Sequence, residues 1–198
     1  FDARNVLARA RCVVAEAEIA LVSRDLAWPE KALETARAAL DAHGDLANAA
    51  HARHLQARRE LLVGQLDRAE ATLATLDPAV LAPASRAIHE LIAAGIALRR
   101  LRTGPARAAL TQAELAARGA AIPALMAEVE SASLVLNTPA ARLIAQGEQR
   151  PILLDEVEAL LASDALVVDA CRHAVRGEGK VVALASRPVL FALVRVLA

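Results

Sequence analysis

Apolar residues recur at three- and four-residue steps over most of the chain, and turn-forming residues interrupt them at intervals. The stretch from Asp2 to about Leu26 predicts one long helix on this spacing. A second helix begins at Pro29, because proline needs no amide partner at the first helical position, and it runs to His43-Gly44. The two helices are expected to form an antiparallel hairpin.

Two further helical pairs follow. Asp45 is expected to cap a helix that Gly64 ends, and Asp67 to Glu70 opens a partner helix that closes at Leu76-Asp77-Pro78. The third pair runs from Pro83 to Leu101 and then from Ala106 to Arg118-Gly119.

A fourth, shorter pair is also predicted. Its second helix has Thr138-Pro139 as cap and first residue and carries Leu143-Ile144. Its first helix carries Ile122, Leu125, Met126, Val129 and Leu136.

Superposing the turns places Ala32, Ala69 and Ala109 in register, with periods of 37 and 40 residues, and Leu73 and Ala113 follow one helical turn later. The segment Leu62-Val63-Gly64-Gln65-Leu66-Asp67-Arg68-Ala69-Glu70-Ala71 resembles the L-x-G-x-x-x-x-A turn of the tetratricopeptide repeat (TPR) family, and Asp77-Pro78 resembles its closing Asp-Pro. The resemblance covers roughly residues 3 to 146. The period exceeds the usual ~34 residues and the large aromatic side chains are missing, so the match is to degenerate, longer-period relatives.

Those divergent repeats look like the helical sensor or linker regions of large bacterial transcription regulators of the MalT type. Since each pair has an apolar face that it cannot bury alone, neighbouring pairs are expected to stack into an α-solenoid with a concave surface. The expected fold class is therefore mainly α, a solenoid of about four TPR-like hairpins with a small C-terminal β-hairpin plus helix.

The chain changes character after Gly147. Residues 146–150 are polar, and Leu153 to Leu161 predicts a short bridging helix. Beyond it, the β-branched runs at 166–169, 174–175 and 181–184 surround the turn Arg176-Gly177-Glu178-Gly179-Lys180 and predict a β-hairpin. Ser186 is expected to cap a last apolar helix, whose start Pro188 shifts.

The order of these elements, from Leu166 to Ala198, is similar to the opening of the OmpR-type winged-helix DNA-binding domain. In that family a small antiparallel sheet ends in G-x-x-V-x-L-T/S and an apolar helix follows at once, a pattern that 180–184 and 189–197 fit. An unrelated hairpin-helix cap is the alternative. The predicted domains are a repeat domain (1–146), a linker with a bridging helix (147–165) and the winged-helix-like element (166–198).

The sequence stops within what would be the first helix of such a domain, before any recognition helix or wing. Base contacts in a major groove are therefore not expected from these residues alone. Three possibilities stay open: the natural protein continues beyond Ala198, the remainder has been removed, or the fragment has become a structural cap.

Composition supports a helical, globular protein. Apolar residues make up 56% and aromatic residues only 2%, which excludes an all-β fold. The 23 basic and 23 acidic residues cancel, so no net field draws the chain to DNA.

The absence of a long uncharged apolar run predicts a cytoplasmic protein with no membrane partner. Cys12 and Cys171 are too far apart for a Cys-x-x-Cys motif and are expected to be buried as small apolar residues.

No catalytic constellation is present, so we expect a protein that is not an enzyme and that has no cofactor. Motifs for nucleophilic serine, phosphate-binding, dinucleotide-binding and zinc-protease sites are missing. His51 and His54 have the i,i+3 spacing of metal ligands, but two ligands do not make a metal site and a solvated helix face is expected instead.

Local basic clusters are the remaining candidates for contacts. In the C-terminal element we expect nucleic-acid or acidic-partner contacts from Arg172, Arg176, Lys180 and Arg187. On the helical repeats, surface contacts are expected from Arg53, Arg58, Arg59, Arg99, Arg100 and Arg102.

The function expected from these features is regulatory, as part of a bacterial transcription regulator. In this hypothesis the repeats bind a protein or effector and control a C-terminal winged-helix output that binds DNA, and a homodimer is an open possibility. The alternative is a TPR-like protein-interaction scaffold without a DNA role.

Overall fold

The computed structural model describes residues 3–197, so Phe1, Asp2 and Ala198, which the predicted helices and domains include, lie outside it. The described residues form nine α-helices, a short 3-10 helix and five strands. The chain divides into two compact units, Phe1–Ser133 and Leu134–Ala198, with the division inside helix α7. We describe each unit separately.

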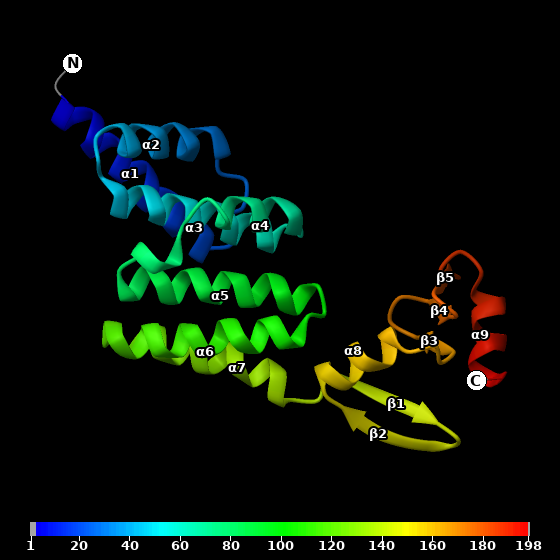
Figure 1. Cartoon of the computed structure of the whole chain (residues 1–198). Helices are drawn as coiled ribbons and strands as arrows, with labels where there is room; N and C mark the ends of the chain where they lie inside the picture. The colour runs from blue at the N-terminus through cyan, green and yellow to red at the C-terminus, as the bar shows by residue number, and fades with distance from the viewer. Residues whose placement is uncertain (1–2, 198) are drawn as a thin grey trace. The chain divides into compact units, whose positions relative to one another are not determined.

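The first unit is built from antiparallel helices in three successive pairs (Figure 1). The pairs are α1 (Ala3–Val22) with α2 (Glu30–Ala42), α3 (Leu46–Leu62) with α4 (Leu66–Leu73), and α5 (Pro83–Arg99) with α6 (Thr103–Ala120). A 3-10 turn, η1 (Pro78–Val80), joins the second pair to the third, and α7 (Pro123–Asn137) follows the third. The first three predicted hairpins are thus confirmed as helical pairs.

Local signals account for most helix boundaries. The Asp45 side chain accepts a hydrogen bond from the Asn48 amide and caps α3 as predicted. Pro83 occupies the first turn of α5, where no amide donor is needed. Helix α1 ends at Val22, earlier than expected, because the chain reverses at Arg24 with a φ of 61°.

The first helices of successive pairs contact one another, α1 with α3 and α3 with α5, and α2 and α4 contact the next first helix as well. The cores are small-residue cores: Ala49 and Ala57 on α3 are fully buried, as are Ala69 on α4 and Ala87 on α5. Alanine lets helices approach closely. Gly95 on α5 allows a still closer approach, because a Cβ at this position would lie only 2.9 Å from Cδ2 of Leu61 on α3.

The structure aligns the second and third helical pairs in a different register from the one predicted from the sequence. Gly64 and Leu101 both have positive φ, 81° and 54°, at the tight turn between the two helices of their pairs. With these turns superposed, buried Ala69 matches buried Ala106, and buried Leu73 matches buried Leu110, all 37 residues apart. The predicted alignment with Ala109 and Ala113 at a period of 40 residues is therefore replaced by this one.

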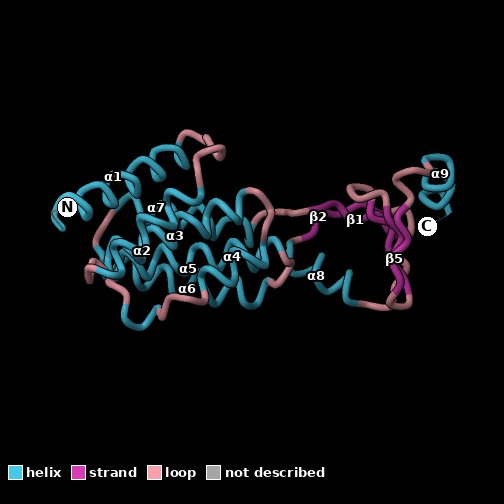
Figure 2. Tube along the Cα trace, turned by 90° about the horizontal axis from the view of Figure 1, so that it is seen from above, coloured by secondary structure: helices cyan, strands magenta, loops and turns pink. Residues whose placement is uncertain are grey.

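The second unit contains the strands. Strands β1 (Ala141–Ala145) and β2 (Glu148–Ile152) form an antiparallel hairpin, and α8 (Leu154–Ala162) follows. Strands β3 (Val167–Asp169), β4 (Ala174–Gly177) and β5 (Lys180–Ala183) form an antiparallel three-stranded sheet in the order β3-β4-β5. Helix α9 (Pro188–Leu197) is the last element, and Figure 2 shows the strands and helices of this part by type.

One predicted element is wrong. Leu143 and Ile144 lie in strand β1, not in the second helix of a fourth pair, and Thr138-Pro139 caps no helix. The reason is local: Gln146 and Gly147 have φ values of 52° and 81°, which make a two-residue turn of the kind that closes a β-hairpin. By contrast, the strands predicted between 166 and 184, the short helix near 153–161 and the final helix are confirmed.

Both cysteines differ from expectation. Cys12 on α1 and Cys171 in the turn after β3 are free and exposed. Cys12 faces outward because the inward positions of α1 are taken by Ala10, Val14 and Ala17. None of the helices formed by residues 3–197 is long and apolar enough to cross a membrane.

Candidate functional site

The arginines predicted to line the surface of the repeats form ion pairs between helices. Arg53 on α3 binds Asp41 of α2 with two hydrogen bonds, of 3.2 and 2.8 Å. Arg58, also on α3, pairs with Glu128 of α7. Their first partners are therefore carboxylates of the same unit.

The same arrangement recurs at the ends of α3 and α5. Arg59, near the end of α3, pairs with Glu30 at the start of α2. Arg100, just beyond α5, pairs with Asp67 in the first turn of α4 and, at 3.0 Å, with Glu70 one turn further along that helix. In both cases an arginine at the end of a first helix binds a carboxylate near the start of the preceding second helix, where a negative charge also complements the helix dipole.

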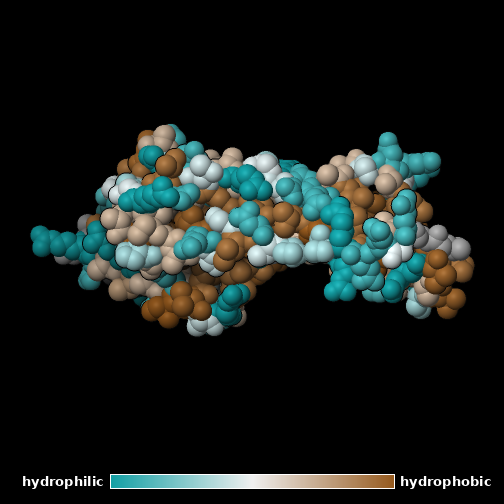
Figure 3. All heavy atoms as spheres, turned by 90° about the horizontal axis from the view of Figure 1, so that it is seen from below, coloured by the Kyte–Doolittle hydropathy of each residue, from teal (hydrophilic) through white to brown (hydrophobic). Residues whose placement is uncertain are grey.

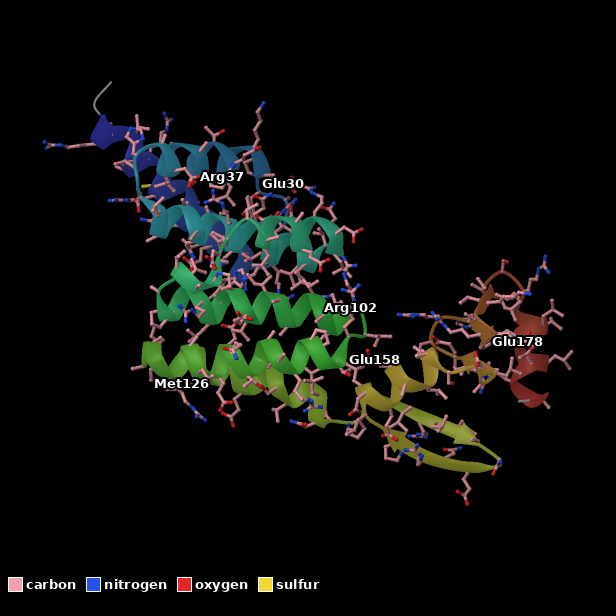
Figure 4. All side chains as sticks on the ribbon, viewed as in Figure 1. Glu30, Arg37, Arg102, Met126, Glu158 and Glu178 are labelled. Atoms are coloured by element: carbon pink, nitrogen blue, oxygen red, sulfur yellow. The ribbon has the colours of Figure 1, made fainter. Side chains whose placement is uncertain are left out.

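The other two arginines of this group have looser surroundings. Arg102 lies 4.0 Å from Glu70, and both side chains are 54% exposed. Arg99 is exposed on the last turn of α5. Figure 4 shows Glu30 at the start of α2 and Arg102 beyond the end of α5. The structure therefore does not gather the six arginines into one basic patch.

Arg59 makes the most complete set of contacts. Its Nε donates a hydrogen bond of 3.1 Å to the Leu26 carbonyl, and its guanidinium lies 5.4 Å from the centroid of the Trp28 ring. With the Glu30 ion pair, this side chain connects α3 to the turn between α1 and α2. Its role is to hold the first pair against the second.

The basic residues of the C-terminal element do not share one face. In the β4–β5 ladder Arg176 pairs with Val181 and Gly177 pairs with Lys180. Because side chains alternate along a strand, Arg176 and Lys180 point to opposite faces of the sheet. Arg172 lies in the turn after β3, where its backbone N–H donates a hydrogen bond of 3.0 Å to Asp169 Oδ1. Arg187 directly precedes α9.

Helix α9 leaves much of its apolar surface uncovered. Phe191 is buried and its ring centroid lies 4.9 Å from that of His173. Leu184, which precedes α9 in the chain, is also buried. Around them, apolar side chains stay exposed: Val189, Leu190, Leu193 and Val196. Figure 3 shows apolar surface in this part of the second unit. This face is large for ten residues and marks a surface suited to a protein contact.

A buried polar pair between α3 and α5 was not predicted. His54, expected on a solvated face, is only 1% exposed, and His89 of α5 is 7% exposed. Burial, followed by the nearby His89, His51 and Arg58, lowers the pKa of His54 to about 3. Burial also lowers the pKa of His89. His51 is separate, because its Nε2 lies 3.2 Å from Glu18.

Glu60 is a second buried polar residue on α3. Its carboxylate accepts hydrogen bonds from Thr72 at 2.8 Å and Gln56 at 3.2 Å, and Arg68 lies 3.3 Å away. These contacts link the Glu60 carboxylate to α4 and to the preceding turn of α3. Among residues 3–197 no three histidine, cysteine or carboxylate side chains gather as metal ligands.

Comparison with protein-family models, curated proteins and solved structures gave no match.

Proposed function

We propose that this protein is regulatory, and that its helical unit binds a protein or effector and controls a DNA-binding output that begins in the second unit. The observation that carries the proposal is the order of elements from β3 to α9. A three-stranded antiparallel sheet is followed at once by an apolar helix. This is the order of elements that resembles the opening of the OmpR-type winged-helix domain.

The exposed face of α9 supports this proposal. A helix that buries Phe191 beside His173 and leaves Leu190 and Leu193 exposed needs further apolar partners. In a winged-helix domain the following helices supply them. In the helical unit, the contacts of α1 with α3 and of α3 with α5 agree with the stacking of a TPR-like solenoid.

One observation favours the alternative, a protein-interaction scaffold. Arg176 and Lys180 lie on opposite faces of the sheet, so these residues do not form a phosphate-binding surface by themselves. In the scaffold hypothesis the exposed face of α9 is a protein-binding surface and no DNA is bound.

The test measures affinity for random duplex DNA by fluorescence anisotropy over a salt series, using the natural polypeptide that contains this chain. We expect binding that weakens steeply with salt, and a decrease in both affinity and salt slope when Arg172, Lys180 and Arg187 are changed to alanine. The matched control changes two arginines and one lysine of the helical unit, Arg24, Arg107 and Lys31, and should leave the affinity unchanged. Absence of binding would favour the scaffold.

A further inference from the structure

The outer face of α1 carries an apolar stripe that stays exposed in the first unit. Helix α1 packs inward through residues at 10, 14, 17 and 21, and it lies at the margin of the unit in Figure 2. On its other side, exposed residues recur at alternating steps of four and three. Ile19 and Val22 are 69% and 80% exposed. The stripe consists of Ala8, Cys12, Ala15, Ile19 and Val22. This spacing is that of a coiled-coil seam.

Charged residues border the stripe in a definite order. Arg9 and Glu16 lie along one border, and Arg11 and Glu18 lie along the other, each pair seven residues apart. Each border therefore runs from positive to negative along the helix. In a parallel pair, a residue on one border meets the residue five positions further along the other border of the second copy, so only Arg11 would meet a glutamate, Glu16. In an antiparallel pair both arginines have an acidic partner, because Arg9 lies beside Glu16 and Arg11 beside Glu18.

We propose that α1 is a self-association surface that pairs with α1 of a second copy of this chain in the antiparallel direction. When Cys12 faces Ala15 of the second copy, Ala8 faces Ile19, so a small side chain meets a large one. In the same register Arg9 lies beside Glu16 and Arg11 beside Glu18. One register thus satisfies both the apolar stripe and the charged borders.

The charged side chains are placed to serve this contact. Arg9 and Glu16 are exposed and have no ion-pair partner among the described residues. Arg11 binds Asp45 at 2.8 Å and Glu18 lies 3.2 Å from His51, yet their side chains remain 56% and 55% exposed. They can therefore reach across to a second copy while keeping their own partners. The inference rests on α1 alone and does not depend on the proposed function.

Cysteine cross-linking tests the orientation. In a background with Cys12→Ser and Cys171→Ser, one chain carries Ala8→Cys and a second carries Ile19→Cys. Mild oxidation of the mixture is expected to give a disulfide-linked heterodimer, while each chain alone gives no disulfide-linked dimer. The matched control pairs the Ala8→Cys chain with an Ala108→Cys chain, whose cysteine lies on the exposed face of α6, and should give no cross-link. Cross-linking of the Ala8→Cys chain with itself would overturn the antiparallel arrangement, and no cross-link in the mixture would overturn the surface itself.

Charge exchange tests the borders in solution. Arg9→Glu and Glu16→Arg are each expected to weaken self-association roughly tenfold by sedimentation, because each change places like charges together twice in the dimer. An equimolar mixture of the two variants should recover association, since every border contact is then attractive. Helical circular dichroism of each variant verifies the fold. Unchanged association of the single variants, or no recovery in the mixture, would contradict the proposal.

Discussion

The imidazole rings of His54 and His89 meet edge to face between α3 and α5, with their centroids 5.8 Å apart and an interplanar angle of 75°. Neither ring nitrogen of His54 has a hydrogen-bond partner among the described residues, and Nδ1 of His89 has none either. The pair lies at the contact between successive helical pairs. Protonating either ring places an uncompensated charge in that contact.

Stability should therefore fall as the pH falls through the range in which free histidine titrates. Unfolded His54 takes up a proton near its ordinary pKa of 6.5, whereas folded His54 does so only at about 3. The unfolded state thus binds more protons below pH 6.5. For one such proton the free energy of unfolding should decrease by about 1.4 kcal/mol in total between about pH 7.5 and 5.5, and the full slope of about 1.4 kcal/mol per pH unit is reached only below about pH 5.5. Urea unfolding followed by circular dichroism between about pH 7.5 and 5.5 measures this decrease, in a window where most carboxylates remain ionised.

Replacing His54 by leucine should remove the part of the pH dependence that His54 contributes and leave the part from His89, whose pKa burial also lowers. The variant should also be more stable at neutral pH by about 1–2 kcal/mol, because an apolar side chain replaces buried polar atoms without partners. The matched control is His43→Leu at an exposed position, which should leave the slope unchanged. An unaltered pH dependence in the His54 variant would assign the effect to other groups.

Arg59 gives a second prediction, because its guanidinium lies over Trp28, the single tryptophan of the chain. Arg59→Ala should lower the free energy of unfolding by about 1–2 kcal/mol, as it removes the hydrogen bond to Leu26 and the ring contact together. Arg59→Lys keeps the charge but not the Nε donor, so its free energy of unfolding should lie between those of the wild type and of Arg59→Ala. Tryptophan fluorescence reports the local change, and Arg107→Ala, at an exposed position of α6, is the control.

The helical part was largely predictable because its signals are local. Asp45 as a cap, Pro83 in a first turn and Gly64 with positive φ each fix a boundary from neighbouring residues. The wrong helix around Leu143 has a physical cause as well. Short apolar runs do not distinguish strand from helix. Thr138-Pro139 also has the residue types of a helix N-cap followed by a first helical residue. The decisive signal, the turn at Gln146-Gly147, lacks the asparagine or aspartate that commonly marks such turns.

The sites were less predictable because their partners are distant in sequence. Arg58 pairs with Glu128, 70 residues further along the chain, and Arg59 with Glu30 on another helix. Spacing alone could identify arginines on a helix but could not tell an ion pair from a free cation. Likewise, the spacing of His51 and His54 does not reveal that α5 covers only the second of them.

Backbone strain at the end of α6 gives a third prediction. Ala121 is exposed and adopts the left-handed conformation, with φ 54° and ψ 35°, as the C-cap of α6. Glycine adopts this conformation without the steric cost of Cβ, so Ala121→Gly should raise the free energy of unfolding by about 0.5–1 kcal/mol. Ala108→Gly, inside the same helix and also exposed, should instead lower it by about 1 kcal/mol. Equal effects at both positions would contradict this explanation.

The β1–β2 hairpin supplies the last prediction. Gln146 and Gly147 connect the paired residues Ala145 and Glu148, and both central residues have positive φ. Asparagine adopts positive φ more readily than glutamine, so Gln146→Asn should stabilise the hairpin by about 0.5 kcal/mol. Gly147→Ala should destabilise it by about 1 kcal/mol or more, since φ is 81° there.

Amide hydrogen exchange measures this prediction within the second unit, because it reports on single ladder positions. Protection of the β1 and β2 amides should increase in Gln146→Asn and decrease in Gly147→Ala, whereas the β4–β5 hairpin should stay unchanged. The β4–β5 turn, Glu178-Gly179, has the same positive-φ geometry, with φ values of 49° and 72°, and provides the matched control. Glu178→Asn should raise protection in β4 and β5 and leave β1 and β2 as they were. If either asparagine variant loses protection in its own hairpin, the turn geometry is not what limits the stability of these strands.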